Sequence, residues 1–384
     1  MDTVWPQGSA DACRTTPGMP RRRRTGPRRE DDDGGSEGHK AEIEHVFDTR
    51  QPFLWQDPAD RSIRESSLGL AEQAQSAAPV RRARAANFAA LITLFGSEAN
   101  AEKAWQLLER LYDVNREFDD VALNFIARAD VPVDRARAAL HRFFSAQQQL
   151  DPEDLILERG DPLYPHRLLD SGDAPRFIYV RQSEGILDRP SLAVVGTRNP
   201  TAEGSLRARK LGALLAKAGV VVVSGLAKGI DTAAHTGCIE AGGRTVAVVG
   251  TPLTQAYPKE NFDLQNLIGH TGAVVSQFAP GATVTRASFP LRNATMSGLS
   301  LGTVVIEASE TSGALIQARR ALQQGRRLFI PRSAVDNEAL SWPKHYAGRG
   351  AVVFSDIDEL VTSLGIGPRL STSIADSRSA SLSA

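Results

Sequence analysis

The chain has 384 residues, of which 41% are hydrophobic and 23% are charged, and its net charge is zero. This composition is typical of a globular protein, and the length allows about two to three domains. No apolar run approaches the ~20 residues that a membrane-spanning helix needs, so we expect no membrane segment. The two cysteines, Cys13 and Cys238, form neither a disulfide framework nor a metal-ligand spacing, which favours the reducing cytoplasm.

The first 150 residues divide into two predicted regions. Residues 1–45 hold a basic run at Arg21–Arg24, an acidic run at Glu30–Asp33 and little apolar surface to bury, so we expect a disordered tail. Residues 46–150 are predicted to form a small helical domain. It either packs against its neighbour or spaces it, or it binds a partner or DNA, for which the sequence shows no fingerprint. Three stretches in this domain show apolar residues at helical spacing: 80–95, 101–112 and 133–144.

From residue 151 to 335, strand patterns alternate with helix patterns. A short apolar run at 192–195 stops at Gly196, an amphipathic helix follows, and a β-branched run at 220–223 ends in Ser224-Gly225. Further strand patterns lie at 244–250, 273–277, 302–308 and 326–331. The alternation predicts an α/β fold, an extended Rossmann-like, doubly wound and mainly parallel sheet preceded by the small helical domain. Two segments are expected after it: a strand–helix extension at 336–367 and a Ser-rich disordered tail at 368–384.

Positive charge and glycine gather where the predicted strands end. Residues 192–332 carry 15 Lys and Arg against seven Asp and Glu, a net charge of +8 within a neutral chain. Open α/β sheets bind ligands at the carboxyl ends of their strands, where glycine lets backbone amides approach a phosphate and Arg or Lys supplies charge. The pattern predicts a rim that holds successive phosphates of a nucleic-acid strand. The residues of this rim are Gly196, Arg198, Ser224, Gly225, Lys228, Gly229, Arg292, Asn293, Ser312 and Gly313.

Arg198 and Lys228 follow the first two strands of this series. The first two strands of a doubly wound sheet are usually neighbours, so these two side chains should converge on one pocket. Both side chains should also be exposed, because an unpaired buried cation is costly.

Other chemistries find little support in the sequence. The dinucleotide fingerprint is missing after the first strand and no phosphate-loop motif occurs, so we expect no cofactor and no nucleotide hydrolysis. No metal-ligand set is clustered, and no catalytic residue is predicted. Asp231 and His235 suggest a hydrolase beside Ser224, but G-x-S-x-G is absent here, so we expect the pair to fix the turn by hydrogen bonds. Glu307 is either a carboxylate in a ligand pocket or the partner of a helix N-terminus.

Six motifs follow one another between residues 160 and 332: Val195-Gly-Thr-Arg198, Ser224-Gly-Leu-Ala-Lys-Gly-Ile-Asp231 with Ala234-His235, Tyr257-Pro258 with Asn261, Phe289-Pro-Leu-Arg292-Asn293, Gly298-Leu-Ser300, and Glu307-Ala with Ser312-Gly-Ala-Leu-Ile. Together they resemble the DprA/Smf family of DNA-processing proteins. The resemblance implies single-stranded DNA binding, dimerisation and loading of the RecA recombinase during natural transformation. It also implies that Arg198 and Lys228 are the main phosphate contacts, with Phe289, Arg292 and Asn293 extending the rim. The strand at 304–306 and the helix at 314–322 are the region that pairs in this family.

The sequence departs from the family pattern at Ala294, Gln277, Gln317 and Arg332. Ala294 removes a cation from the predicted rim and the others alter turn and pocket chemistry, which indicates a divergent member. Two alternatives stay open. The first is that the same fold binds a nucleotide-derived small molecule, either as a binding protein or as a phosphoribohydrolase-like enzyme. The second is a scaffold in which the basic rim is incidental. The Pro-Gly-Gly-x-Gly-Thr loop of the phosphoribohydrolases is absent, which weighs against hydrolysis.

Overall fold

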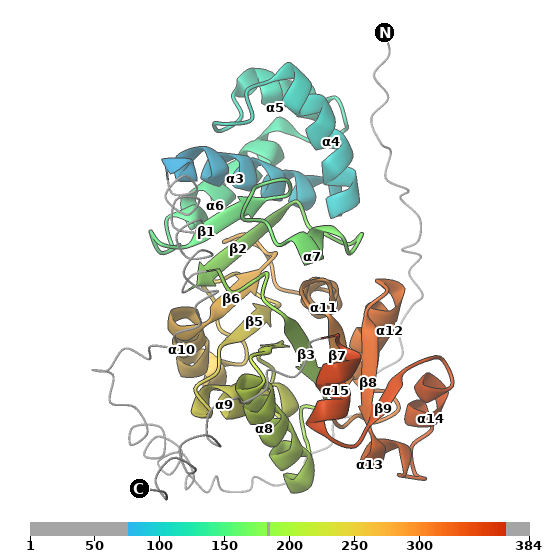
Figure 1. Cartoon of the computed structure of the whole chain (residues 1–384). Helices are drawn as coiled ribbons and strands as arrows, with labels where there is room; N and C mark the ends of the chain where they lie inside the picture. Colours follow the sequence, from blue (N-terminus) through green and yellow to red (C-terminus); the bar gives the residue numbers. More distant parts are fainter. Residues whose placement is uncertain (1–75, 183–184, 366–384) are drawn as a thin grey trace, which may run out of the picture. The chain divides into compact units, whose positions relative to one another are not determined.

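The computed structural model describes residues 76–182 and 185–365, which form a group of helices followed by a mixed sheet with its own helices (Figure 1). The predicted tails at 1–45 and 368–384 lie outside the described residues, as does the part of the predicted helical domain before residue 76. In the part of the chain that the structure describes, no helix is both long and apolar enough to cross a membrane.

One nine-stranded sheet runs through the described residues. Its strands are, in spatial order, β1 (Leu155–Glu158), β2 (Phe177–Gln182), β6 (Ala273–Ser276), β5 (Thr245–Val249), β4 (Val221–Ser224), β3 (Ser191–Val195), β7 (Gly302–Val305), β8 (Arg327–Pro331) and β9 (Val352–Phe354). The two pairings of β2 are antiparallel and the others are parallel. The order β5-β4-β3-β7-β8-β9 is that of a Rossmann sheet, so the predicted fold class is confirmed. The order reverses between β3 and β7, and ligands of this fold bind at that switch point.

Helices cover both faces of the sheet. The helices α8 (Ala202–Lys217), α9 (Ile230–Glu240) and α15 (Ile357–Ser363) share one apolar cluster with the strands, and α11 (Ser288–Leu299) and α12 (Gly313–Gln323) share another. Along β3, Leu192 and Val194 enter the first cluster, whereas Ala193 and Val195 enter the second. Burial of both faces explains why this strand is an unbroken apolar run. The other described elements of this region are α7 (His166–Leu169), η1 (Lys259–Asn261), α10 (Phe262–Thr271), α13 (Arg332–Val335) and α14 (Trp342–Ala347).

Strand β7 lies inside the sheet, between β3 and β8. Val304, Val305 and Ile306 are at most 3% exposed. The expectation that the strand at 304–306 pairs with a second copy of the chain is therefore wrong, because both of its edges already carry sheet hydrogen bonds. In α12, which was expected to take part in the same pairing, Ile316 is 39% exposed.

The helices that precede the sheet are α3 (Ala78–Phe95), α4 (Glu98–Leu111), α5 (Asp120–Ala127) and α6 (Val133–Gln147). Their apolar core continues into that of the sheet. Phe88 of α3 and Trp105 of α4 lie against Phe177 of β2, with ring centroids 5.6 and 6.3 Å away. Aromatic pairs at such distances add to the area that they bury, so this junction is a packed core.

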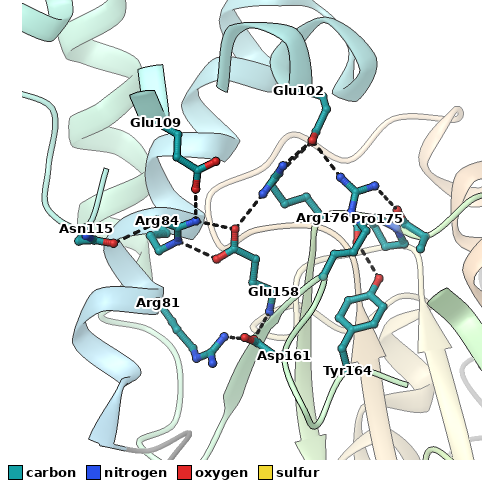
Figure 2. A network of polar contacts seen from close by, with 12 residues as sticks. Arg81, Arg84, Glu102, Glu109, Asn115, Glu158, Asp161, Tyr164, Pro175 and Arg176 are labelled. Atoms are coloured by element: carbon teal, nitrogen blue, oxygen red, sulfur yellow. Dashed lines mark hydrogen bonds and ion pairs between the residues drawn. The ribbon is translucent and has the colours of Figure 1, made fainter. Parts of the chain in front are cut away.

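A polar network closes the same junction (Figure 2). Arg84 of α3 donates to both carboxylate oxygens of Glu158 of β1, at 2.7 and 2.8 Å. Arg176 donates to Glu158 at 2.9 Å and also pairs with Glu102 of α4. The Arg84, Glu158 and Arg176 side chains are 17%, 12% and 12% exposed. Bidentate, shielded ion pairs of this kind fix geometry, so the network holds the helices in register with β1.

Candidate nucleic-acid interface

The switch point between β3 and β7 is closed by the chain itself. Glu307, which follows β7, accepts from the backbone N–H of Thr201 (3.0 Å) and from its hydroxyl (2.7 Å), and Thr201 caps α8. A Cβ at Gly196 would lie 2.5 Å from Ile230 Cγ1 and 2.8 Å from the Glu307 carbonyl oxygen. The α8 N-terminus, where this fold usually binds a pyrophosphate, is therefore already satisfied by a carboxylate. Of the two roles open for Glu307, these hydrogen bonds are those of a helix N-terminal partner.

The turn after β4 is held from inside. Asp231 is 5% exposed, and its Oδ2 accepts from the N–H groups of Gly225 (3.1 Å) and Ala227 (3.4 Å). Ser224 is fully buried and its hydroxyl donates to the Val194 carbonyl oxygen at 2.6 Å. These bonds fix the turn as predicted for Asp231. They also correct the expectation that the Ser224 side chain lies on the exposed rim, because it is buried and turned into the sheet.

Arg292 of α11 lies beneath the same turn and is 5% exposed. It donates to the carbonyl oxygens of Gly225 and Val248, the latter at 2.6 Å, and its Nε donates to Asn293 Oδ1 at 3.1 Å. A Cβ at Gly225 would collide with this guanidinium, so the glycine makes room for Arg292. Burial lowers the pKa of Arg292, while the nearby Asp231 carboxylate opposes that shift. The expectation that Arg292 lies on the rim is therefore wrong for its side chain, and Asn293 is half-buried beside it.

His235 of α9 is fully buried, and its Nδ1 lies 2.7 Å from Thr245 Oγ1. Because the Thr245 hydroxyl donates to Val222 (2.7 Å), it must accept from His235, so the proton sits on Nδ1. Nε2 has no hydrogen-bond partner among the described residues. Burial, aided by the charge of Arg292, lowers the pKa of His235 to about 3. His235 is thus a neutral, buried group that bonds β5. This corrects the expectation that it fixes the turn after β4 together with Asp231.

A pH dependence of stability follows from this burial. Between pH 3 and pH 6.5, His235 is protonated in the unfolded chain, where its pKa is the ordinary 6.5, but stays neutral in the folded protein. The stabilisation is thus complete above pH 6.5 and falls as the pH drops towards 3, by about 1.4 kcal/mol per pH unit. Urea unfolding of the wild type and of His235→Asn at pH 7 and pH 5 checks this, with a difference in pH dependence of about 2 kcal/mol expected. Equal pH dependence of the two proteins would contradict the assignment.

Cations and aromatic rings stand on the loops after β3, β4 and β5 and at the start of α11. We refer to them together as the cation–aromatic surface: Arg198, Lys228, Tyr257, Lys259 and Arg286, which are exposed, and Phe289, which is half-buried. The Arg198 guanidinium lies 5.6 Å from the centroid of the Phe289 ring, and the Tyr257 ring lies 5.3 Å from the same ring. Arg198 and Lys228 are both exposed, which confirms that expectation. Lys228 forms an ion pair with Glu260 at 2.6 Å, whereas Arg198 has no acidic partner in the described ranges.

The loops that carry this surface touch one another. Gly229 has a φ of +81°, and a Cβ there would lie 2.5 Å from the Thr197 carbonyl oxygen, so the turns after β3 and β4 meet. Asn261 donates from Nδ2 to the Leu226 carbonyl oxygen and to Thr232 Oγ1, both at 2.9 Å, and thereby ties η1 to the Lys228 turn. Leu226 is a buried residue with a φ of +55°, a strained conformation of the kind found at binding sites.

Tyr257 was absent from the residues predicted for the rim. Its ring packs against Phe289, yet the residue is 50% exposed. Burial of one side of an aromatic ring leaves the rest available for stacking. The signal in the sequence was an aromatic residue two positions before Lys259 and four before Asn261, within a loop otherwise rich in polar residues.

Ser312 and Gly313 make no side-chain contact with the cation–aromatic surface among the described residues. Ser312 caps α12 by accepting from the Ala314 N–H at 3.3 Å. It also lines an open groove of about 480 Å³ between α12 and α14, whose other walls include Ile316, Arg319 and His345. None of the other rim residues lines this groove. In the described ranges, no group of three His, Cys, Asp or Glu is placed to hold a metal ion.

The structure also locates the residues that depart from the family pattern. Ala294 is 8% exposed in α11 and Gln317 is 1% exposed in α12. Gln317 Nε2 donates to Thr303 at 3.4 Å, and Gln277 accepts from Thr295 at 2.5 Å. The expectation that position 294 belongs to the rim is therefore wrong for this chain, because this face of α11 packs against the interior.

Residues 155–365 match the family model described as DNA recombination-mediator protein A. The chain belongs to this family. The DNA processing protein DprA of Streptococcus pneumoniae is 42% identical over 177 residues, which are 46% of this chain and 62% of that protein. Protein Smf of Synechocystis is 37% identical over 235 residues, 60% of this chain and 58% of that protein. The chain thus spans about three fifths of the length of these curated relatives.

The fold agrees with this assignment to the recombination-mediator family. The X-ray structure of DprA from Streptococcus pneumoniae superposes with a TM-score of 0.56 at 30% sequence identity, covering 68% of this chain and 91% of that one. The region matched by the family model runs from β1 to the end of the described residues. The turns that carry Arg198, Lys228 and Phe289 therefore all lie inside the family region.

Proposed function

We propose that this member of the recombination-mediator family binds single-stranded DNA on its cation–aromatic surface. The observation that carries the proposal is the exposed Arg198 guanidinium stacked on Phe289, with Tyr257 packed against the same ring. Proteins that bind single strands without sequence preference combine cations that follow the backbone with aromatic faces on which bases stack. Duplex DNA keeps its bases inside the helix, so the aromatic part of this surface favours a single strand.

The closed switch point supports DNA over a nucleotide-derived small molecule. Glu307 occupies the α8 N-terminus, where a nucleotide phosphate would have to displace a like charge. The cation–aromatic surface is open and lies on loops, which suits a polymer that is bound at several points. We therefore propose a binding protein without cofactor or catalytic activity, acting in the cytoplasm.

A binding titration tests this function. The purified chain is titrated at one salt concentration with an oligothymidine, a duplex of equal length and a nucleoside monophosphate, and the complexes are followed by sedimentation. We expect the single strand to bind most tightly, and affinity to fall steeply with added salt, because bound cations release counterions. Equal affinity for the duplex would contradict the preference, and tighter binding of the monophosphate would favour the small-molecule alternative.

Two partners extend the proposal. A homodimer would double the cation–aromatic surface along one strand and raise avidity. The exposed Ile316 and the groove between α12 and α14 support an interface there, and the same sedimentation experiment gives the stoichiometry.

As a recombination mediator, the DNA-bound chain would load RecA. Faster RecA assembly on the strand with the wild type, but not with Arg198→Ala, is the expected result, and equal rates would contradict a loading role.

A further inference from the structure

Helix α6 lies directly against the loop that leads to Phe289. Arg142 of α6 donates from Nη2 to Thr283 Oγ1 at 2.8 Å. Gly281 of the same loop has a φ of +87°, and a Cβ there would lie 3.0 Å from Ala146 Cβ and 3.4 Å from the Arg142 carbonyl oxygen. The loop runs on through the exposed Arg286 to α11, so it connects the residues that contact α6 with Arg286 and Phe289 of the cation–aromatic surface.

Two arginines on the outer face of α6 pair with no carboxylate in the part of the chain that the structure describes. Arg135 and Arg142 are both exposed and stand seven residues apart, which places them on one face, about 10.5 Å apart along the axis. Arg142 bonds the neutral Thr283 hydroxyl, and Arg135 has no acidic partner within the described ranges. Asp134 is adjacent in sequence, but successive residues on a helix do not face each other.

Arg137 of the same helix provides the contrast. It lies about 200° around the axis from Arg135 and forms an ion pair with Asp120 at 2.6 Å. Its charge is therefore compensated on another face of α6. The helix thus carries its uncompensated charge on the stripe that begins at the Gly281 loop.

The position of α6 is set by the rest of the fold. Ala139, Leu140 and Phe143 on its inner face belong to the apolar core that is shared with β1, β2 and β6. The polar network of Figure 2 joins α3 to Glu158 of β1, and α4 to Arg176, which directly precedes β2. The arginine stripe is thus held in a fixed position relative to the Gly281 loop.

We infer that α6 prolongs the single-strand path, with Arg142 and then Arg135 neutralising backbone phosphates beyond Arg286. This inference rests on the proposed function, since it extends the strand bound at Arg198. The helices before the sheet then contribute to the length of DNA that is bound, in addition to packing.

Oligonucleotides of different length distinguish binding at the cation–aromatic surface from binding along α6. The variant Arg135→Gln/Arg142→Gln removes both charges and keeps polar side chains, and Arg137→Gln is the matched control on the same helix. Each is titrated with oligothymidines of about 6 and about 30 nucleotides, the shorter being within the span of one compact single-strand site. We expect the double variant to bind the short strand like the wild type and the long strand about tenfold more weakly, with a salt slope shallower by about 1.4. The control should match the wild type on both strands.

Two results would overturn the inference. The first is a double variant that binds the long strand as tightly as the wild type, and the second is an equal loss for the Arg137→Gln control. The Arg198→Ala variant should lose affinity for both lengths, which keeps the two claims apart. If Arg198→Ala binds the short and the long oligothymidine as tightly as the wild type does, the proposed function fails. The extension along α6 then fails with it.

Discussion

Arg292→Ala is expected to lower the free energy of unfolding by about 3–5 kcal/mol, the range for breaking a buried, charge-paired site. The substitution leaves the carbonyl oxygens of Gly225 and Val248 without their donor and Asp231 without its nearby cation. It also opens a cavity beneath the turn that carries Lys228. Denaturant unfolding of the variant measures the loss.

Arg286→Ala is the matched control for this variant. Arg286 lies two residues before α11 and is exposed, so its removal should change stability by less than about 0.5 kcal/mol. Its DNA affinity should nevertheless fall, because it belongs to the cation–aromatic surface. An Arg292→Ala protein that unfolds like the wild type but loses DNA affinity would mean that Arg292 contacts DNA after all.

Arg198→Ala should weaken binding of single-stranded DNA by about 1–3 kcal/mol, as for a charge-assisted hydrogen bond to phosphate. The loss is expected to be large because Arg198 is exposed, stacked on Phe289 and without an acidic partner in the described ranges. Lys228→Ala should cost less, since Lys228 must first leave Glu260, with which it pairs at 2.6 Å. Fluorescence anisotropy with a labelled oligothymidine compares the two variants.

The folding of these two variants gives the control. Both side chains are exposed, so the melting temperature should stay close to that of the wild type. If Arg198→Ala unfolds more easily while its DNA affinity is retained, Arg198 pins the turn after β3 and makes no phosphate contact. A larger loss of affinity for Lys228→Ala than for Arg198→Ala would contradict the role given to the Glu260 pair.

The fold could be predicted because its signals are local. The runs at 192–195 and 220–223 are apolar on both faces, and Gly196 and Gly225 follow them where the chain must turn. The exposure of Arg198 and Lys228 followed from the cost of burying an unpaired cation. These inferences use neighbouring residues only, and strand order then follows from the short crossovers of α/β folds.

The interior of the site could not be predicted because its partners are distant in sequence. Arg292 bonds carbonyl groups 67 and 44 residues away, and Glu307 bonds Thr201 across 106 residues. A polar sequence such as Leu291-Arg292-Asn293 reads as surface until those carbonyl groups are placed. Tyr257 was missed for the converse reason, since an aromatic residue is ordinarily assigned to the core, whereas here it is 50% exposed.

The salt dependence of single-strand binding tests the central claim most directly. The affinities of the wild type and of Arg198→Ala for one oligothymidine are measured over a range of salt concentrations, and the logarithm of each is plotted against that of the salt concentration. Loss of one phosphate contact should make the slope for Arg198→Ala shallower by about 0.7. Parallel slopes for the two proteins would show that Arg198 contacts no phosphate, and would contradict DNA binding at the cation–aromatic surface.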